Sequence, residues 1–146
     1  MRPINRHVSL LIRMGDRFIN RQLAGSGVSS GTGVILLELR DGGKRNPAAL
    51  AAAIGVDKAY VTRSLQALKQ AGYVVVSPDT SDRRLLNVSL TEKGRAAAGL
   101  MENAMLAWLA LVSKGVSQAE LDTVEVVFDT LYANAVAYFT DDPDQG

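Results

Sequence analysis

The stretch that decides the fold is residues 46–74, NPAALAAAIGVDKAYVTRSLQALKQAGYV. Its first part predicts a short helix, because Asn46 is a favourable N-cap, Pro47 suits the first helical position and Gly55 is a typical stop. A second helix is predicted to begin after Asp57, which is another favourable N-cap. Two short helices joined by a tight turn that contains glycine form a helix-turn-helix.

The second helix of this pair has a polar outer face. When successive residues are placed about 100° apart, Val61, Leu65 and Leu68 share one face, which predicts their burial. The opposite face carries side chains that are polar or small enough for a close approach, namely Ala59, Thr62, Arg63, Gln66 and Gln70. Such a face fits the major groove of DNA, where Arg pairs with guanine and Gln with adenine. A plain solvated face explains this helix equally well when it is considered alone.

A β-hairpin with a basic tip is predicted to follow. Residues 73–77 are dense in β-branched and aromatic side chains, and residues 85–90 are also β-prone. The polar loop between them carries Arg83 and Arg84, and two arginines on a projecting turn suit the minor groove or the phosphates of DNA. We expect Asp82 to hold a neighbouring arginine as a carboxylate–guanidinium pair. The alternative is an ordinary turn with a surface ion pair.

Further helices are expected on both sides of this central unit. Apolar residues at helical spacing predict two helices before it, over residues 4–19 and 34–39. Sequences typical of helix starts predict two more after it, beginning at residues 91–94 and 117–120. Ser29 or Ser30 is expected to cap the helix that contains residues 34–39. That helix also opens on Gly31-x-Gly33, which is unusually rich in glycine for a helix start. Residues 141–146 are expected to form a frayed tail.

The charge of the chain is unevenly distributed. The formal net charge is only +1. Residues 40–95 nevertheless hold ten Lys or Arg against five Asp or Glu, whereas residues 96–146 hold one against eight. A basic middle followed by an acidic segment indicates a localised surface for a polyanion. Chance clustering on solvated faces is the alternative that charge alone leaves open.

The composition disfavours several classes of function. The chain has no cysteine and only one histidine, His7, so thiolate chemistry and Cys-ligated metals are excluded and we expect neither a metal nor a cofactor. No glycine-rich phosphate loop, nucleophile elbow or paired-carboxylate site is present, so we do not expect an enzyme. The apolar residues near the N-terminus are interrupted by charges, which predicts neither a signal peptide nor a membrane span. We therefore expect a cytoplasmic protein with no membrane partner.

Three successive segments form one combined motif: LAxxIGVDxxYVTRxLxxLxxxGYV over residues 50–74, SDRR over 81–84 and VSLTEKG over 88–94, where x is any residue. The combined pattern resembles that of the MarR family of bacterial transcriptional regulators. The resemblance implies a mainly α-helical fold with a small β-hairpin wing, in which residues 30–95 form a winged helix-turn-helix within a single domain over 1–146. It also implies that dimerisation helices, over 1–24 and 96–140, interlock with those of a second subunit.

The resemblance also implies roles for individual residues. It places Thr62 and Arg63 on a recognition helix, and Asp82 and Arg84 on a wing. Together with the polar face and the hairpin tip described above, it gives the candidate DNA-binding residues Lys58, Ala59, Tyr60, Thr62, Arg63, Gln66, Asp82, Arg83 and Arg84.

A homodimer is expected on physical grounds as well. The first and last helices carry apolar stripes that the small central unit cannot cover alone, and such stripes find partners. Two recognition helices related by a two-fold axis would enter successive major grooves about 34 Å apart, which predicts a palindromic operator in double-stranded DNA. The alternative is that both stripes fold back onto their own subunit.

The resemblance further implies a small-molecule effector, because many members of the family bind aromatic or phenolic compounds between the dimerisation helices and the winged unit. Side chains of this chain that could line such a cleft are Met14, Phe18, Met101, Met105 and Trp108. Plain core packing is the commoner role of Met and Trp at helical spacing.

We therefore predict a MarR-type transcriptional regulator that binds a palindromic operator as a homodimer and is released by a small-molecule effector. The alternative is a winged-helix module that makes non-specific DNA contacts or protein contacts and has no effector.

Overall fold

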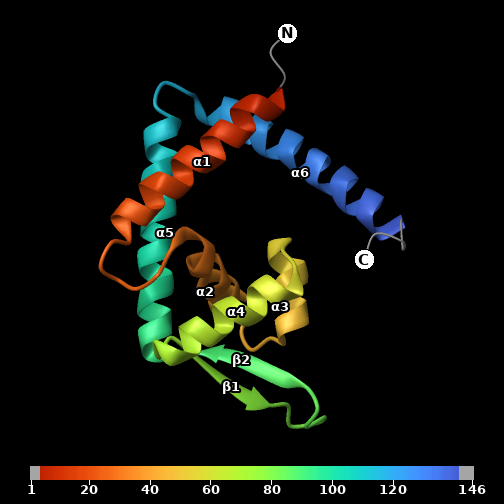
Figure 1. Cartoon of the computed structure of the whole chain (residues 1–146). Helices are drawn as coiled ribbons and strands as arrows, with labels where there is room; N and C mark the ends of the chain where they lie inside the picture. The colour runs from red at the N-terminus through yellow and green to blue at the C-terminus, as the bar shows by residue number, and fades with distance from the viewer. Residues whose placement is uncertain (1–3, 142–146) are drawn as a thin grey trace. The chain divides into compact units, whose positions relative to one another are not determined.

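The computed structural model describes residues 4–141, with side chains as far as residue 139. All but the first residue of the tail expected at 141–146 lies outside this range. The elements follow in the order α1 (Ile4–Gln22), α2 (Ser30–Gly42), α3 (Pro47–Ile54), α4 (Lys58–Gln70), β1 (Val74–Pro78), β2 (Leu86–Leu90), α5 (Glu92–Val112) and α6 (Gln118–Asp141) (Figure 1). The predicted fold, mainly α-helical with one β-hairpin wing, is confirmed.

The chain divides into two compact units, Met1–Trp108 and Leu109–Gly146. The first unit holds α1 to α4, the hairpin and most of α5, and therefore contains the complete helix-turn-helix and the wing. The second unit holds α6. Within the described part of the chain, no helix combines the length and the apolar character that a membrane crossing needs.

One hydrophobic core holds the first unit together. Its largest fully buried side chains come from α2, α3, α4, β2 and α5, and they are Ile35, Leu36, Leu50, Val61, Val88 and Met101. Because these helices and the hairpin share the same core, the wing and the helix-turn-helix are packed as one body.

The helix-turn-helix has the caps that its sequence predicts. The side chain of Asn46 accepts the backbone N–H of Ala49 at 2.7 Å, and the carboxylate of Asp57 accepts that of Tyr60 at 2.7 Å. Gly55 ends α3 in the left-handed region, with φ 69° and ψ 34°. That conformation carries a steric cost for other residues, which is why glycine is favoured at this turn.

The wing is an antiparallel hairpin that is tied to the segment before α3. In its register Val74 lies opposite Leu90, and Pro78 lies opposite Leu86. The backbone N–H of Arg45 donates to the carbonyl of Val88 at 3.1 Å, and the N–H of Val88 donates to the carbonyl of Arg45 at 2.7 Å. These two hydrogen bonds add Arg45 to the edge of the hairpin and fix β2 against the helix-turn-helix.

The start of α5 is joined to the start of the wing. The hydroxyl of Thr91 accepts the N–H of Gly94 at 3.0 Å and donates to the carbonyl of Gly72 at 2.8 Å. Gly94 lies so close to the chain before β1 that a Cβ at this position would overlap the carbonyl oxygen of Tyr73. The Thr-x-x-Gly sequence is therefore explained by a helix cap and a close backbone approach.

Candidate nucleic-acid interface

Helix α4, predicted to be the recognition helix, is divided into a buried and an exposed face as its sequence predicts. Val61, Leu65 and Leu68 are buried in the core. The side chains on the opposite face are exposed, and they are Ala59, Thr62, Arg63, Gln66 and Gln70. The hydroxyl of Thr62 donates to the carbonyl of Lys58 at 2.9 Å, so in the free protein its proton is held within the helix. Thr62 therefore presents an acceptor oxygen and a methyl group to the outside.

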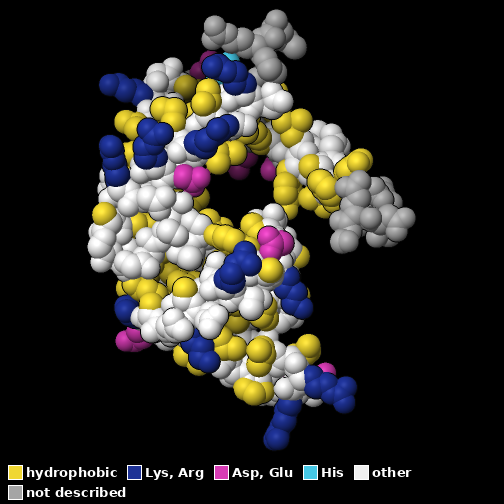
Figure 2. All heavy atoms as spheres, viewed as in Figure 1, with side chains coloured by type: hydrophobic (Ala, Val, Ile, Leu, Met, Phe, Trp, Pro, Cys, Tyr) yellow, Lys and Arg dark blue, Asp and Glu magenta, His cyan; other side chains and the backbone are white. Residues whose placement is uncertain are grey.

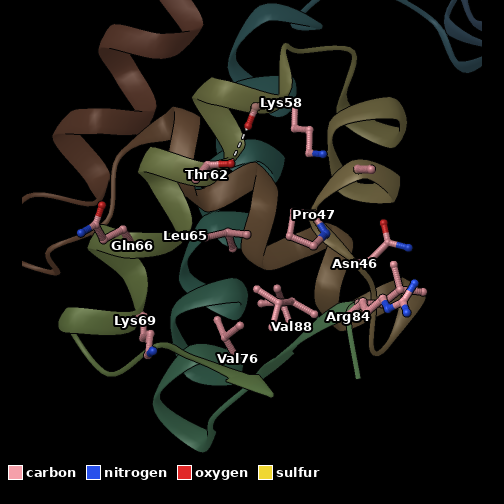
Figure 3. A pocket seen from close by; sticks show the side chains of 13 residues that line it. Asn46, Pro47, Lys58, Thr62, Leu65, Gln66, Lys69, Val76, Arg84 and Val88 are labelled. Atoms are coloured by element: carbon pink, nitrogen blue, oxygen red, sulfur yellow. Dashed lines mark hydrogen bonds between the residues drawn. The ribbon is translucent and has the colours of Figure 1, made fainter. Parts of the chain in front are cut away.

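A groove of about 550 Å³ lies between α4, the start of α3 and the wing (Figure 3). Its apolar lining includes Leu65, Val76 and Val88, whose side chains point into the groove in Figure 3. Four predicted DNA-binding residues line the same groove, namely Lys58, Thr62, Gln66 and Arg84. The groove thus brings α4 and the wing to one surface that includes the basic side chains of Lys58 and Arg84.

Three arginines of this surface are available to a partner. Within the described residues, the guanidinium groups of Arg63, Arg83 and Arg84 form no ion pair. All three residues are exposed. Figure 2 shows basic side chains at the far end of the wing, away from the body of the first unit. Unpaired guanidinium groups on a projecting turn are suited to phosphates and to base edges.

The tip of the wing is organised by Asp79, which was not among the predicted site residues. Its carboxylate accepts the N–H of Ser81 at 2.8 Å, the N–H of Asp82 at 3.2 Å, the hydroxyl of Ser81 and the side-chain amide of Asn87. These hydrogen bonds, with those from Ser81 first, hold the pKa of Asp79 well below its usual range. An aspartate that opens a polar turn often accepts backbone N–H groups in this way, so the sequence did carry a signal for this role.

The predicted pairing of Asp82 with an arginine side chain is wrong. The carboxylate of Asp82 instead accepts the backbone N–H of Arg84 at 3.0 Å. Short polar side chains in turns favour such local bonds, because a nearby N–H can be reached without ordering a long side chain. Asp82 therefore shapes the turn, and the Arg84 guanidinium stays free of it.

Tyr60 differs from its neighbours on α4. Its ring packs against the hydrophobic core, whereas Lys58 and Ala59 are exposed. Its backbone N–H is held by Asp57 at the helix cap. The remaining predicted DNA-binding residues lie on the outer face of α4 or at the wing tip.

The five predicted effector residues lie on α1 and α5 of the first unit. The rings of Phe18 and Trp108 are 5.6 Å apart between centroids and tilted by 40°. Met14 and Met105 are exposed, and Met101 is fully buried in the core beside α2. The structure therefore brings Phe18 and Trp108 together and places Met101 in the interior.

Comparison with known proteins gives the same family as the sequence pattern. A sequence model of the MarR family matches residues 26–85. The chain is 41% identical over 68 residues to the HTH-type transcriptional repressor NicR of Pseudomonas putida, and the match covers 47% of this chain and 43% of NicR. The chain thus spans less than half the length of this relative. The predicted resemblance to the MarR family is confirmed.

Two solved structures show the same fold. A mutant of MarR from E. coli complexed with operator DNA is 23% identical, with a TM-score of 0.80 over 89% of this chain and 94% of the other. Bordetella bronchiseptica BpsR, whose DNA binding is regulated by 6-hydroxynicotinic acid, is 22% identical, with a TM-score of 0.81 over 90% of this chain and 94% of the other.

Proposed function

We propose that this chain, whose winged helix belongs to the MarR family, is a transcriptional regulator that binds a palindromic DNA operator as a homodimer in the cytoplasm. The observation that carries the proposal is the common surface of α4 and the wing. On that surface Lys58, Thr62 and Arg84 line one groove, and the guanidinium group of Arg84 forms no ion pair with the described residues. A helix for the major groove beside an arginine-bearing wing suits one DNA duplex.

Selection of bound fragments from a random DNA pool tests this function. We expect a palindrome whose half-sites lie about ten base pairs apart, because a two-fold axis places two recognition helices about one helical turn apart. Binding of the selected fragment should survive competitor DNA. Recovery of no sequence preference, with affinity that depends on salt alone, would favour the alternative of a module with non-specific DNA contacts.

Replacement of Arg63 by Ala should relax the base preference of the protein. An arginine that pairs with guanine contributes about 1–3 kcal/mol of discrimination against other bases, and Ala cannot replace that pair. The measurement is a repeat of the selection with Arg63→Ala. Arg63→Lys serves as the matched control, since it keeps the charge but not the fork of donors. Equal weakening on every sequence would instead assign Arg63 to a phosphate.

Replacement of Arg84 by Ala should lower affinity on all sequences and leave dimerisation intact. A lost phosphate contact reduces the slope of log affinity against log salt by about one. Fluorescence anisotropy over a salt series measures that slope. Arg6→Ala removes the same charge from α1 and is the control. An unchanged slope and affinity for Arg84→Ala would remove the wing from the proposed interface.

The homodimer is supported by apolar side chains that the chain leaves exposed on α6. Val124, Val127, Phe128 and Leu131 lie within one face of the helix at helical spacing, and each is 46–48% exposed. An apolar stripe of this length on a helix is typical of an interface between subunits.

Release by a small aromatic or phenolic effector is the finer part of the proposal. It is supported by the contact between Phe18 and Trp108 and by the regulation of the similar protein BpsR by 6-hydroxynicotinic acid. Because Trp108 is the only tryptophan, its fluorescence reports binding near this pair without a label. A panel of phenolic and hydroxynicotinic acids should contain a compound that changes this fluorescence and lowers DNA affinity together. A panel that changes neither would contradict this part.

A further inference from the structure

The first turn of α2 is a junction between helices of the first unit. From α1, the side-chain oxygen of Asn20 accepts the backbone N–H of Ser30 at 2.8 Å. From α4, the hydroxyl of Tyr60 lies against Gly31, so that a Cβ at Gly31 would overlap its oxygen. The start of α2 is therefore in contact with both α1 and the recognition helix.

A third helix, α5, reaches the same turn from another side. A Cβ at Gly33 would lie 2.6 Å from the sulfur and 2.8 Å from the Cγ of Met101. Residues two apart in a helix point about 200° away from each other, so Gly31 and Gly33 face nearly opposite sides of α2. The glycine-rich start of α2 is thus explained by two close contacts, one with α4 and one with α5.

Tyr60 is fixed both at its backbone and at the hydroxyl end of its side chain. Its backbone N–H is bonded to the carboxylate of Asp57 at 2.7 Å, its ring packs against the core, and its hydroxyl end lies on Gly31. A tyrosine ring is rigid, with few rotatable bonds to absorb a displacement. A change at Gly31 should therefore be passed to the first turn of α4.

We propose that Tyr60 is a positioning residue for DNA recognition: by resting on Gly31 it sets the orientation of α4 relative to α2. This role rests on the proposed function, in which α4 enters the major groove. Tyr60 then acts through the helix that carries Thr62 and Arg63 and does not itself contact DNA. Glycine at position 31 is needed because the tyrosine oxygen occupies the space that any other side chain would fill.

Three variants test the contact atom by atom. Gly31→Ala should lower affinity for the selected DNA fragment about tenfold, because a displaced helix weakens its base contacts. Tyr60→Phe removes only the oxygen that rests on Gly31, so α4 loses this contact but keeps the ring against the core, and the affinity should fall less than in Gly31→Ala. The double variant should recover the affinity of Tyr60→Phe, since the next atom, Cζ of residue 60, is 3.6 Å from a Cβ at Gly31, an ordinary contact.

A readout without DNA separates this proposal from the proposed function. In ¹H–¹⁵N spectra of the free protein, Gly31→Ala should shift the amide signals of residues 58–70, and the double variant should restore them. If the parent selects no DNA fragment but these shifts and their reversal are seen, the proposed function fails and the contact between Tyr60 and Gly31 stands. A double variant as shifted as Gly31→Ala, or a Gly31→Ala protein identical to the parent, overturns the proposal.

A fourth variant keeps the test usable if Gly31→Ala does not fold. Tyr60→Leu retains an apolar side chain against the core but cannot reach Gly31. We expect about a tenfold loss of affinity for the selected fragment with an unchanged oligomeric state, as for any loss of base contacts. Parent affinity in Tyr60→Leu would show that the contact does not position α4.

Discussion

Replacement of Leu131 by Asp should convert the protein to a monomer and lower its affinity for the selected palindrome by about 10²–10⁴-fold. Leu131 is 47% exposed on the apolar stripe of α6. A carboxylate buried in an apolar interface would be costly, so the subunits should separate. The two half-sites would then be bound independently, and the gain from linked binding, about 10²–10⁴-fold, would be lost. Analytical ultracentrifugation and fluorescence anisotropy measure the two effects.

Ala133→Asp is the matched control for this experiment. It adds the same charge to the same helix, two residues further on, and Ala133 is exposed on the side of α6 away from the stripe. The control should remain dimeric and bind DNA as the parent does. A dimeric Leu131→Asp protein would show that the exposed stripe on α6 is not the subunit interface.

Replacement of Gly94 by Ala should destabilise the first unit by about 3 kcal/mol, at the upper end of the usual cost of overpacking. The added methyl group would overlap the backbone carbonyl oxygen of Tyr73, which cannot rotate away as a side chain can. Either α5 or the start of β1 must then move, and the cap formed by Thr91 would be strained. Urea unfolding followed by circular dichroism measures the loss.

Gly99→Ala is the control for that change. Gly99 lies in the same helix, and a Cβ there meets no atom within 4 Å. Because alanine has a higher helix propensity than glycine, this variant should gain up to about 1 kcal/mol. Equal stability of the Gly94→Ala protein and the parent would mean that the close approach of α5 to Tyr73 can relax at no cost.

The sequence was sufficient for the helix-turn-helix and for the orientation of its second helix. The caps at Asn46 and Asp57 are local hydrogen bonds between residues three apart, and such bonds depend on sequence alone. The burial of Val61 and Leu65 follows from helical spacing. Helix-capping preferences and hydrophobic periodicity were therefore enough to predict these parts of the fold.

The details that the sequence did not predict depend on competition between partners. Asp82 could bond to an arginine side chain or to a backbone N–H, and the turn geometry decides for the N–H of Arg84. Tyr60 is a predicted DNA-binding residue, and the packing of its ring against the core and of its hydroxyl on Gly31 is a further feature that the sequence did not predict. Which partner such a side chain contacts depends on the folded structure around it, and hydrophobic periodicity does not reveal this.

The hydrogen bonds between Arg45 and Val88 divide the wing into a fixed base and a tip that is free to vary. At the base, β2 shares the hydrophobic core that also holds α4. The loop beyond Pro78 is held mainly by its own bonds around Asp79. If α4 and the wing bind DNA as proposed, a longer or differently charged loop would change how far along the duplex each subunit reaches without disturbing α4.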